Sequence, residues 1–170
     1  MTRCRKQTGF TLLELIVVIG LVATLVAVGL DRLRFYQEAA EAAAAESTLV
    51  TLKSALLIRS AELNAANRWS ELRQLPRHNP FELLEEKPGN YGGYLGAANG
   101  PGQWFFDEAE GSVVYRVARS ETFLAADGGS EMRFHLVGRG VAGDAGNKGS
   151  IAYVSLRART EYRWLNRLIR

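Results

Sequence analysis

The stretch GFTLLELIVVIGLVATLVAVGL, from Gly9 to Leu30, determines how the rest of the chain is interpreted. It begins at the end of a short basic leader and continues as an apolar run of 21 residues from Phe10 to Leu30. With a helical rise of about 1.5 Å per residue, such a run can just cross the ~30 Å hydrocarbon core of a bilayer. We therefore expect a membrane-spanning helix.

Glu14 is the only charged residue between Phe10 and Leu30. A charge at the centre of a membrane helix costs about 2.5 to 3.5 kcal/mol on insertion scales, so a simple anchor would carry Leu or Val there. A second interpretation places Glu14 near the end of the span, where it can reach the headgroups and favour the positive end of the helix dipole. The first interpretation makes Glu14 a functional residue.

The residues Gly9-Phe10-Thr11-Leu12-Leu13-Glu14 resemble the processing motif of type IV prepilins and of the pseudopilins of type II secretion systems. The resemblance implies cleavage between Gly9 and Phe10 by a prepilin peptidase, followed by N-methylation of Phe10. An ordinary secretory signal fits less well, because the apolar run is long, contains a carboxylate and lacks an A-x-A-like site near Asp31.

Cleavage would give Glu14 a cationic partner. Four residues of helix separate the new amine of Phe10 from Glu14 by about 6 Å of rise. An intramembrane carboxylate requires such a partner. In the resembling families, the partner in the filament is the amine of a neighbouring subunit, so Glu14 would set the register of assembly.

Length and charge limit the other possibilities. The 170 residues allow one membrane helix and one globular domain of roughly 100 residues. Three of the 21 Lys and Arg residues precede Gly9, and the other 18 equal the 18 Asp and Glu residues in number. The three basic residues before the span, Arg3, Arg5 and Lys6, exceed by one the two that closely follow it, Arg32 and Arg34. We do not expect nucleic acid binding from this charge balance.

The single cysteine, Cys4, lies in the leader, so the processed chain could form no disulfide. Many type IV pilins close a C-terminal loop with a disulfide, and this departure favours a pseudopilin or a minor pilin. Many pilins also have a proline near the end of the span, where the helix can melt on assembly, but this chain has Asp31 there.

After the span, residues 31–67 are rich in Ala, Glu, Leu and Arg and contain no Pro or Gly, which predicts a continuation of the helix. Its apolar stripe is a predicted core face. The alanine-rich part, Ala39 to Ala45, is better suited to passing other subunits than to burial in its own domain. The stripe consists of Leu49, Leu52, Leu56 and Leu63, widened by Val50 and Leu57.

The rest of the chain predicts a loop region and then strands. Residues 68–102 contain all four prolines and a glycine-rich run, so we expect short pieces, with a brief helix around Phe81 to Glu85. From Gln103 onward the apolar period is two, which predicts a small antiparallel sheet. Its predicted strands are a hairpin of Trp104–Asp107 with Ser112–Ala118, in which Val113, Tyr115 and Val117 share a face, a second hairpin of Thr122–Ala126 with Glu131–Val137, and a strand at Ile151–Arg159.

The predicted fold class is therefore α+β and pilin-like, with a long N-terminal helix whose first half spans the membrane and whose second half packs on a small C-terminal antiparallel sheet. The predicted segments are a cleaved leader at 1–9, a transmembrane and assembly helix at 10–30, its periplasmic continuation at 31–67, a variable connection at 68–102 and the sheet domain at 103–170.

No residue pattern predicts catalysis, a cofactor or a confident metal site. His78 and His135 are the only histidines, and neither has a metal-ligand spacing or a neighbouring nucleophile. Asp144 and Asn147 could offer oxygen ligands to calcium, but too few carboxylates lie near them, so an exposed turn is the preferred interpretation.

The C-terminal arginines could serve DNA capture, for which Tyr162 and Trp164 are the candidate stacking residues. We prefer a solvated strand edge kept positive against unwanted pairing. The arginines are Arg157, Arg159, Arg163, Arg167 and Arg170.

The resemblance implies a structural, minor subunit of a type II secretion pseudopilus or related type IV pilus, in the inner membrane with its sheet domain in the periplasm. Its implied partners are the prepilin peptidase, other pilin or pseudopilin subunits and the inner-membrane assembly platform. The alternatives are a membrane-anchored periplasmic binding module that never polymerises, and a minor pilin in adhesion or DNA uptake.

Overall fold

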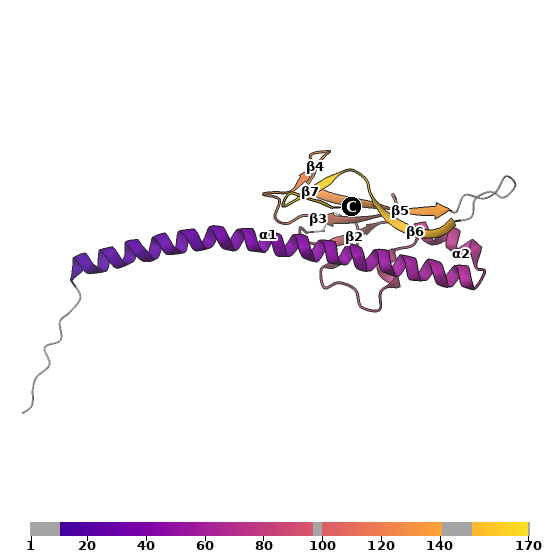
Figure 1. Cartoon of the computed structure of the whole chain (residues 1–170), viewed down its shortest axis with the longest axis horizontal. Helices are drawn as coiled ribbons and strands as arrows, with labels where there is room; N and C mark the ends of the chain where they lie inside the picture. Colours follow the sequence, from indigo (N-terminus) through magenta and orange to yellow (C-terminus); the bar gives the residue numbers. More distant parts are fainter. Residues whose placement is uncertain (1–10, 97–99, 141–150, 170) are drawn as a thin grey trace, which may run out of the picture. The chain divides into compact units, whose positions relative to one another are not determined.

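The computed structural model describes residues 11–96, 100–140 and 151–169. It contains one long helix followed by strands, which confirms the predicted α+β pilin-like architecture (Figure 1). The chain divides into two compact units, Met1–Gln37 and Glu38–Arg170, and helix α1 (Leu12–Ala65) contributes to both.

Helix α1 ends where its backbone geometry requires a special residue. Asn67 adopts φ 57°, in the left-handed region that Asn tolerates better than most residues. The amide of Arg68 donates to the carbonyl of Leu63 at 2.8 Å, and the amide of Asn67 donates to the carbonyl of Asn64 at 3.0 Å. These two bonds satisfy carbonyls that the helix end would otherwise leave unpaired.

The strands form two sheets, where the sequence predicted one. The five-stranded sheet has the order β1-β2-β3-β5-β6, and the three-stranded sheet has the order β4-β7-β8. All neighbours are antiparallel except β1 and β2. The strands are β1 (Tyr91–Tyr94), β2 (Trp104–Asp107), β3 (Ser112–Arg116), β4 (Leu124–Ala125), β5 (Glu131–Gly140), β6 (Ile151–Ala158), β7 (Tyr162–Trp164) and β8 (Arg167–Ile169).

The predicted hairpin of β2 with β3 is confirmed, but the second predicted hairpin is wrong. Strand β4 pairs with β7 in the smaller sheet, and β5 pairs with β3 and β6. Thr122, the first residue of the predicted hairpin, instead hydrogen-bonds to Glu38 on α1. The local sequence pattern could not predict that long-range hydrogen bond.

The connection between helix and sheet is more ordered than predicted. It contains α2 (Trp69–Gln74) and the 3₁₀ turns η1 (Leu75–Arg77) and η2 (Pro80–Leu83). The turn η2 lies where the brief helix was predicted, and the Asn79 side chain accepts a hydrogen bond from the Phe81 amide at 3.1 Å. The unpredicted strand β1 requires a glycine, because a Cβ at Gly92 would lie 2.2 Å from the Phe105 ring.

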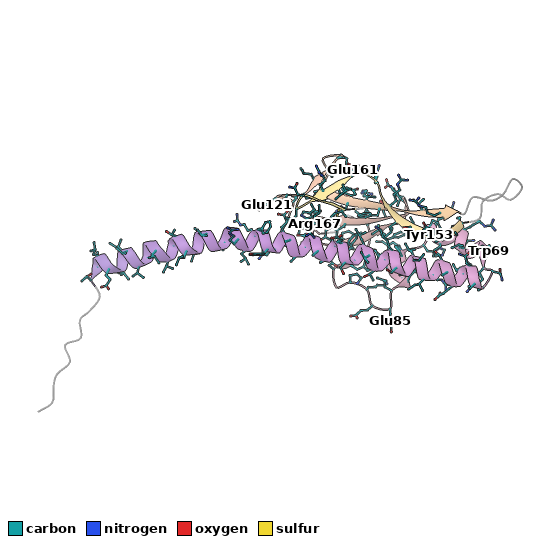
Figure 2. The ribbon with its side chains drawn as sticks, viewed as in Figure 1. Trp69, Glu85, Glu121, Tyr153, Glu161 and Arg167 are labelled. Atoms are coloured by element: carbon teal, nitrogen blue, oxygen red, sulfur yellow. The ribbon has the colours of Figure 1, made fainter. Side chains whose placement is uncertain are left out.

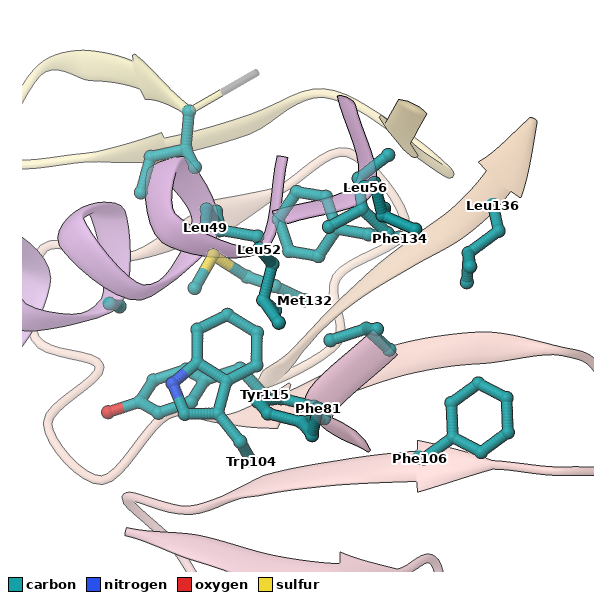
Figure 3. Close-up of a cluster of buried hydrophobic side chains, with 14 of the residues drawn as sticks. Leu49, Leu52, Leu56, Phe81, Trp104, Phe106, Tyr115, Met132, Phe134 and Leu136 are labelled. Carbon is teal, nitrogen blue, oxygen red and sulfur yellow. The ribbon is translucent and has the colours of Figure 1, made fainter. Parts of the chain in front are cut away.

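The core of the globular unit lies between α1 and the inner face of the five-stranded sheet (Figure 3). The predicted stripe is buried at all four leucines, and Val113, Tyr115 and Val117 contribute to the same core. Two details of the prediction are wrong. Val50 and Leu57 are 58% and 55% exposed, because each lies about 100° around the helix from a buried neighbour.

The alanine-rich part of α1 also differs from the prediction. Ala42 and Ala45 are 9% and 1% exposed and belong to the core of their own unit. This part of the helix is therefore buried within its own unit despite its low apolar volume.

Candidate functional site

The N-terminal unit of α1 presents apolar side chains that the chain itself does not bury. Between Leu12 and Leu30 their exposed fractions run from 45% at Val18 to 76% at Leu12. Figure 2 shows these side chains projecting around the helix. The helix is long and apolar enough to cross a membrane, and none of its most apolar stretch is buried within the chain. Lipid or other apolar helices would cover these exposed apolar side chains.

Glu14 lies in the first turn of this helix. The Thr11 hydroxyl accepts a hydrogen bond from the Glu14 amide at 3.2 Å, which satisfies one of the free amides of the helix start. The Glu14 carboxylate forms no ion pair with a residue that the structure describes. Gly9 and Phe10, the predicted processing residues, lie outside the described residues.

Two aromatic residues mark the other end of the apolar segment. Phe35 and Tyr36 are 52% and 64% exposed, and their rings meet edge to face at 5.9 Å. Exposed aromatic residues next to arginines, here Arg32 and Arg34, are typical of the membrane–water interface. About 36 Å of helix separates Leu12 from Tyr36, close to the thickness of a bilayer with its interfacial regions. Phe35 and Tyr36 were not predicted from the sequence, although the pattern of arginines beside aromatics is visible in it.

The globular unit begins on α1 with two carboxylates, Glu38 and Glu41, which we call the carboxylate pair. Glu38 is only 2% exposed. Its Oε1 accepts hydrogen bonds from the Thr122 amide at 2.9 Å, the Thr122 hydroxyl at 2.9 Å and the Trp164 indole at 3.0 Å. Three donors on one oxygen compensate for the burial of the charge.

Glu41 lies one turn further along and binds the segment after β3. It accepts hydrogen bonds from the Tyr115 hydroxyl at 3.0 Å, the Ala118 amide at 2.7 Å and the Arg119 amide at 3.1 Å. Burial raises the pKa of Tyr115 above its ordinary value, and the neighbouring Glu41 charge raises it further. The carboxylate pair therefore fixes α1 to both sheets at the start of the globular unit. The pair was not predicted from the sequence.

The remaining candidate residues do not come together. His78 is exposed at the end of η1, and His135 is half-buried on β5, on the face away from the core. Within the described ranges, no group of three His, Cys, Asp or Glu residues is placed to hold a metal ion. Asp144 and Asn147 lie outside those ranges.

The candidate DNA-capture residues are divided by the fold. Arg157 and Arg159 are exposed near the end of β6, on the face away from the core. Tyr162 and Trp164, the candidate stacking residues, are 0% and 1% exposed and belong to the core, so they are not available to stack on bases.

Comparison with known proteins identifies the N-terminal segment. Residues 4–30 match the family described as the prokaryotic N-terminal methylation motif. The chain carries the prepilin-type signature of type IV pilin-like proteins. No curated protein and no solved structure shows a significant match to this chain.

The motif and the exposed apolar helix coincide. The motif is that of a type IV pilin-like subunit processed by a prepilin peptidase and assembled with other pilin subunits. The single apolar helix near the N-terminus indicates membrane anchoring. In this pilin-like chain, Glu14 is the charged residue on the surface that would face lipid or other subunits.

Proposed function

We propose that this chain is a structural, minor subunit of a type II secretion pseudopilus or a related type IV pilus. In this proposal the prepilin peptidase cleaves between Gly9 and Phe10, Phe10 is N-methylated, and the subunit assembles from the inner membrane with its sheet domain in the periplasm. The observation that carries the proposal is the match of residues 4–30 to the methylation motif, on a helix whose apolar surface is exposed.

We assign Glu14 the role of binding the processed amine of a neighbouring subunit. The proposal is supported by its position in the first helical turn, among side chains that are all exposed, without an ion-pair partner in the described part of the chain. A carboxylate in this setting gains most from a cation supplied by another molecule.

We also propose that the subunit has no catalytic activity and that its work is assembly. The two histidines lie on separate elements, and the buried carboxylates Glu38 and Glu41 are occupied by hydrogen bonds to the chain itself.

Mass spectrometry of the full chain, co-expressed with an active prepilin peptidase, tests the proposal. We expect loss of residues 1–9 and the addition of one methyl group at Phe10. The matched control is Gly9→Leu, which should keep the leader because a bulky residue occupies the scissile position. Retention of the leader by the unaltered chain would contradict the proposal and favour a membrane-anchored binding module.

A further inference from the structure

Strand β6 has one edge that pairs with no strand in the described part of the chain, and two residues of helix α1 hydrogen-bond to that edge. The amide of Val154 donates to the Ser60 hydroxyl at 3.0 Å, and the Ala152 carbonyl accepts a hydrogen bond from the Asn64 side chain. On the opposite edge, which faces β5, the Arg159 amide donates to the Arg133 carbonyl. Backbone groups alternate along a strand, so those of Leu156 and Ala158 point to the same open edge as Val154.

Strand β8 presents a second open edge. It is joined to β7 by Leu165 and Asn166, which have φ 50° and 61° and so form a two-residue hairpin turn of the primed type. In such a hairpin the flanking residues, Trp164 and Arg167, form the hydrogen-bonded pair. The amide and carbonyl of Leu168 therefore point away from β7. Among the described residues apart from Lys53 of α1, none hydrogen-bonds to these outward groups of Leu156, Ala158 or Leu168.

A groove of about 590 Å³ lies where these two edges meet, and we call it the edge groove. Its apolar lining includes Leu156, Leu168 and Ile169. Its charged lining includes Arg139, Arg157 and Glu161, the last of which is labelled in Figure 2. Arg139 and Arg157 form no ion pair within the described part of the chain, whereas Arg159, also in the lining, pairs with Glu110 at 3.3 Å.

We propose that the edge groove binds an extended acidic segment of a partner protein, which adds to β6 as a further strand. The open backbone groups supply the hydrogen bonds of strand addition. The groove volume is in the range of ordinary ligand pockets. The charge of the lining selects the partner, because basic side chains on an edge disfavour pairing with like charges and favour pairing with opposite ones.

The pleat of β6 further specifies the partner. Arg157 lies on the outer face, and Leu156 lies on the face toward the core. Residues of an added strand alternate in the same way, so acidic residues would lie beside Arg157 and apolar residues beside Leu156. The occupant is therefore a strand of alternating acidic and apolar residues. This proposal does not depend on processing of the leader or on assembly through Glu14.

The test uses the full chain in detergent and fluorescent nine-residue peptides. We expect a peptide of alternating Glu and Val to bind with one peptide per chain and to slow amide exchange at Leu156, Ala158 and Leu168. A peptide of alternating Lys and Val should not bind. The Glu–Val peptide with N-methylated backbone amides should also fail to bind, because it cannot donate to the strand edge.

Two charge reversals separate groove binding from general attraction. Arg157→Glu should weaken binding of the Glu–Val peptide about tenfold or more, equivalent to about 1.4 kcal/mol. The control Arg77→Glu, on exposed η1 outside the groove, should leave binding within about twofold. Equal effects of the two reversals, binding of the N-methylated peptide or no binding of the Glu–Val peptide would overturn the proposal. So would protection of the same amides by self-association, which would identify the occupant as a second copy.

Discussion

At the scale of single residues, Glu14 is the position where insertion and assembly make opposite demands. We predict that Glu14→Leu improves membrane insertion, because it removes a charge that costs up to about 3 kcal/mol in the bilayer. Cleavage after Gly9 should persist, since the scissile bond is unchanged. Incorporation into filaments should fall sharply, because the neighbouring amine loses its counter-charge. Membrane fractionation, mass spectrometry and cross-linking measure the three effects.

The matched control for this prediction is Thr24→Leu. It also replaces a polar residue in the apolar segment, but within the described part of the chain the Thr24 hydroxyl bonds only to the Gly20 carbonyl of its own helix, at 2.9 Å. Filaments should form normally with this variant. Wild-type cross-linking of Glu14→Leu would show that Glu14 has no role in assembly.

Tyr115 gives a prediction about pH. Burial, with the nearby Glu41 charge, raises the pKa of Tyr115 from its ordinary value of 10.0. The folded state therefore holds this proton more tightly than the unfolded state, and the stabilisation is complete below pH 10 and declines as the pH rises above it. We expect Tyr115→Phe to lose about 1 kcal/mol at neutral pH, through the missing hydrogen bond to Glu41. Its stability should then fall less steeply above pH 10 than that of the unaltered chain, as measured by urea unfolding.

The two kinds of carboxylate differ in how far the sequence could predict them. Glu14 was predictable because its whole context, a basic leader and an apolar run, is local. The role of Glu38 was not, because its partners Thr122 and Trp164 lie 84 and 126 residues away. In a sequence, Glu38 resembles any surface glutamate of an alanine-rich helix.

At the scale of elements, the stripe on α1 is the best test of the fold. Leu52 is fully buried and Leu57 is 55% exposed, although the sequence analysis placed both on one apolar face. We predict that Leu52→Asp destabilises the globular unit by more than about 3 kcal/mol, because it buries an unpaired charge. Leu57→Asp should cost less than about 1 kcal/mol. Thermal unfolding of the two variants would contradict the assigned face if their losses were similar.

The strands show the same division between local and distant information. The alternating patterns of β2, β3, β5 and β6 were sufficient to predict them. Strand β4 has two residues and β8 has three, which is too few for a period to be visible. Their partners are decided by the carboxylate pair and by the hairpin turn at Leu165 and Asn166, which lacks the glycine usual in such turns.

At the scale of the whole molecule, the chain consists of a unit that requires an apolar environment and a unit that has its own core. The boundary between them lies between Gln37 and Glu38. Every described apolar side chain before that boundary is exposed, and the buried stripe begins after it. A cut near this point should therefore remove the segment that requires an apolar environment and leave a soluble unit that folds on its own core.

We predict that a fragment from Phe35 to Arg170 is soluble and folds cooperatively without lipid or reducing agent, because it keeps the core and contains no cysteine. A fragment that begins at Ala42 keeps the whole leucine stripe but loses the carboxylate pair. The Trp164 indole and the Thr122 amide would then lack their acceptors, at roughly 1 to 3 kcal/mol for each buried donor left unpaired. We expect this shorter fragment to unfold at a lower urea concentration. Equal stability of the two fragments in urea would show that the leucine stripe alone fixes α1 to the sheets.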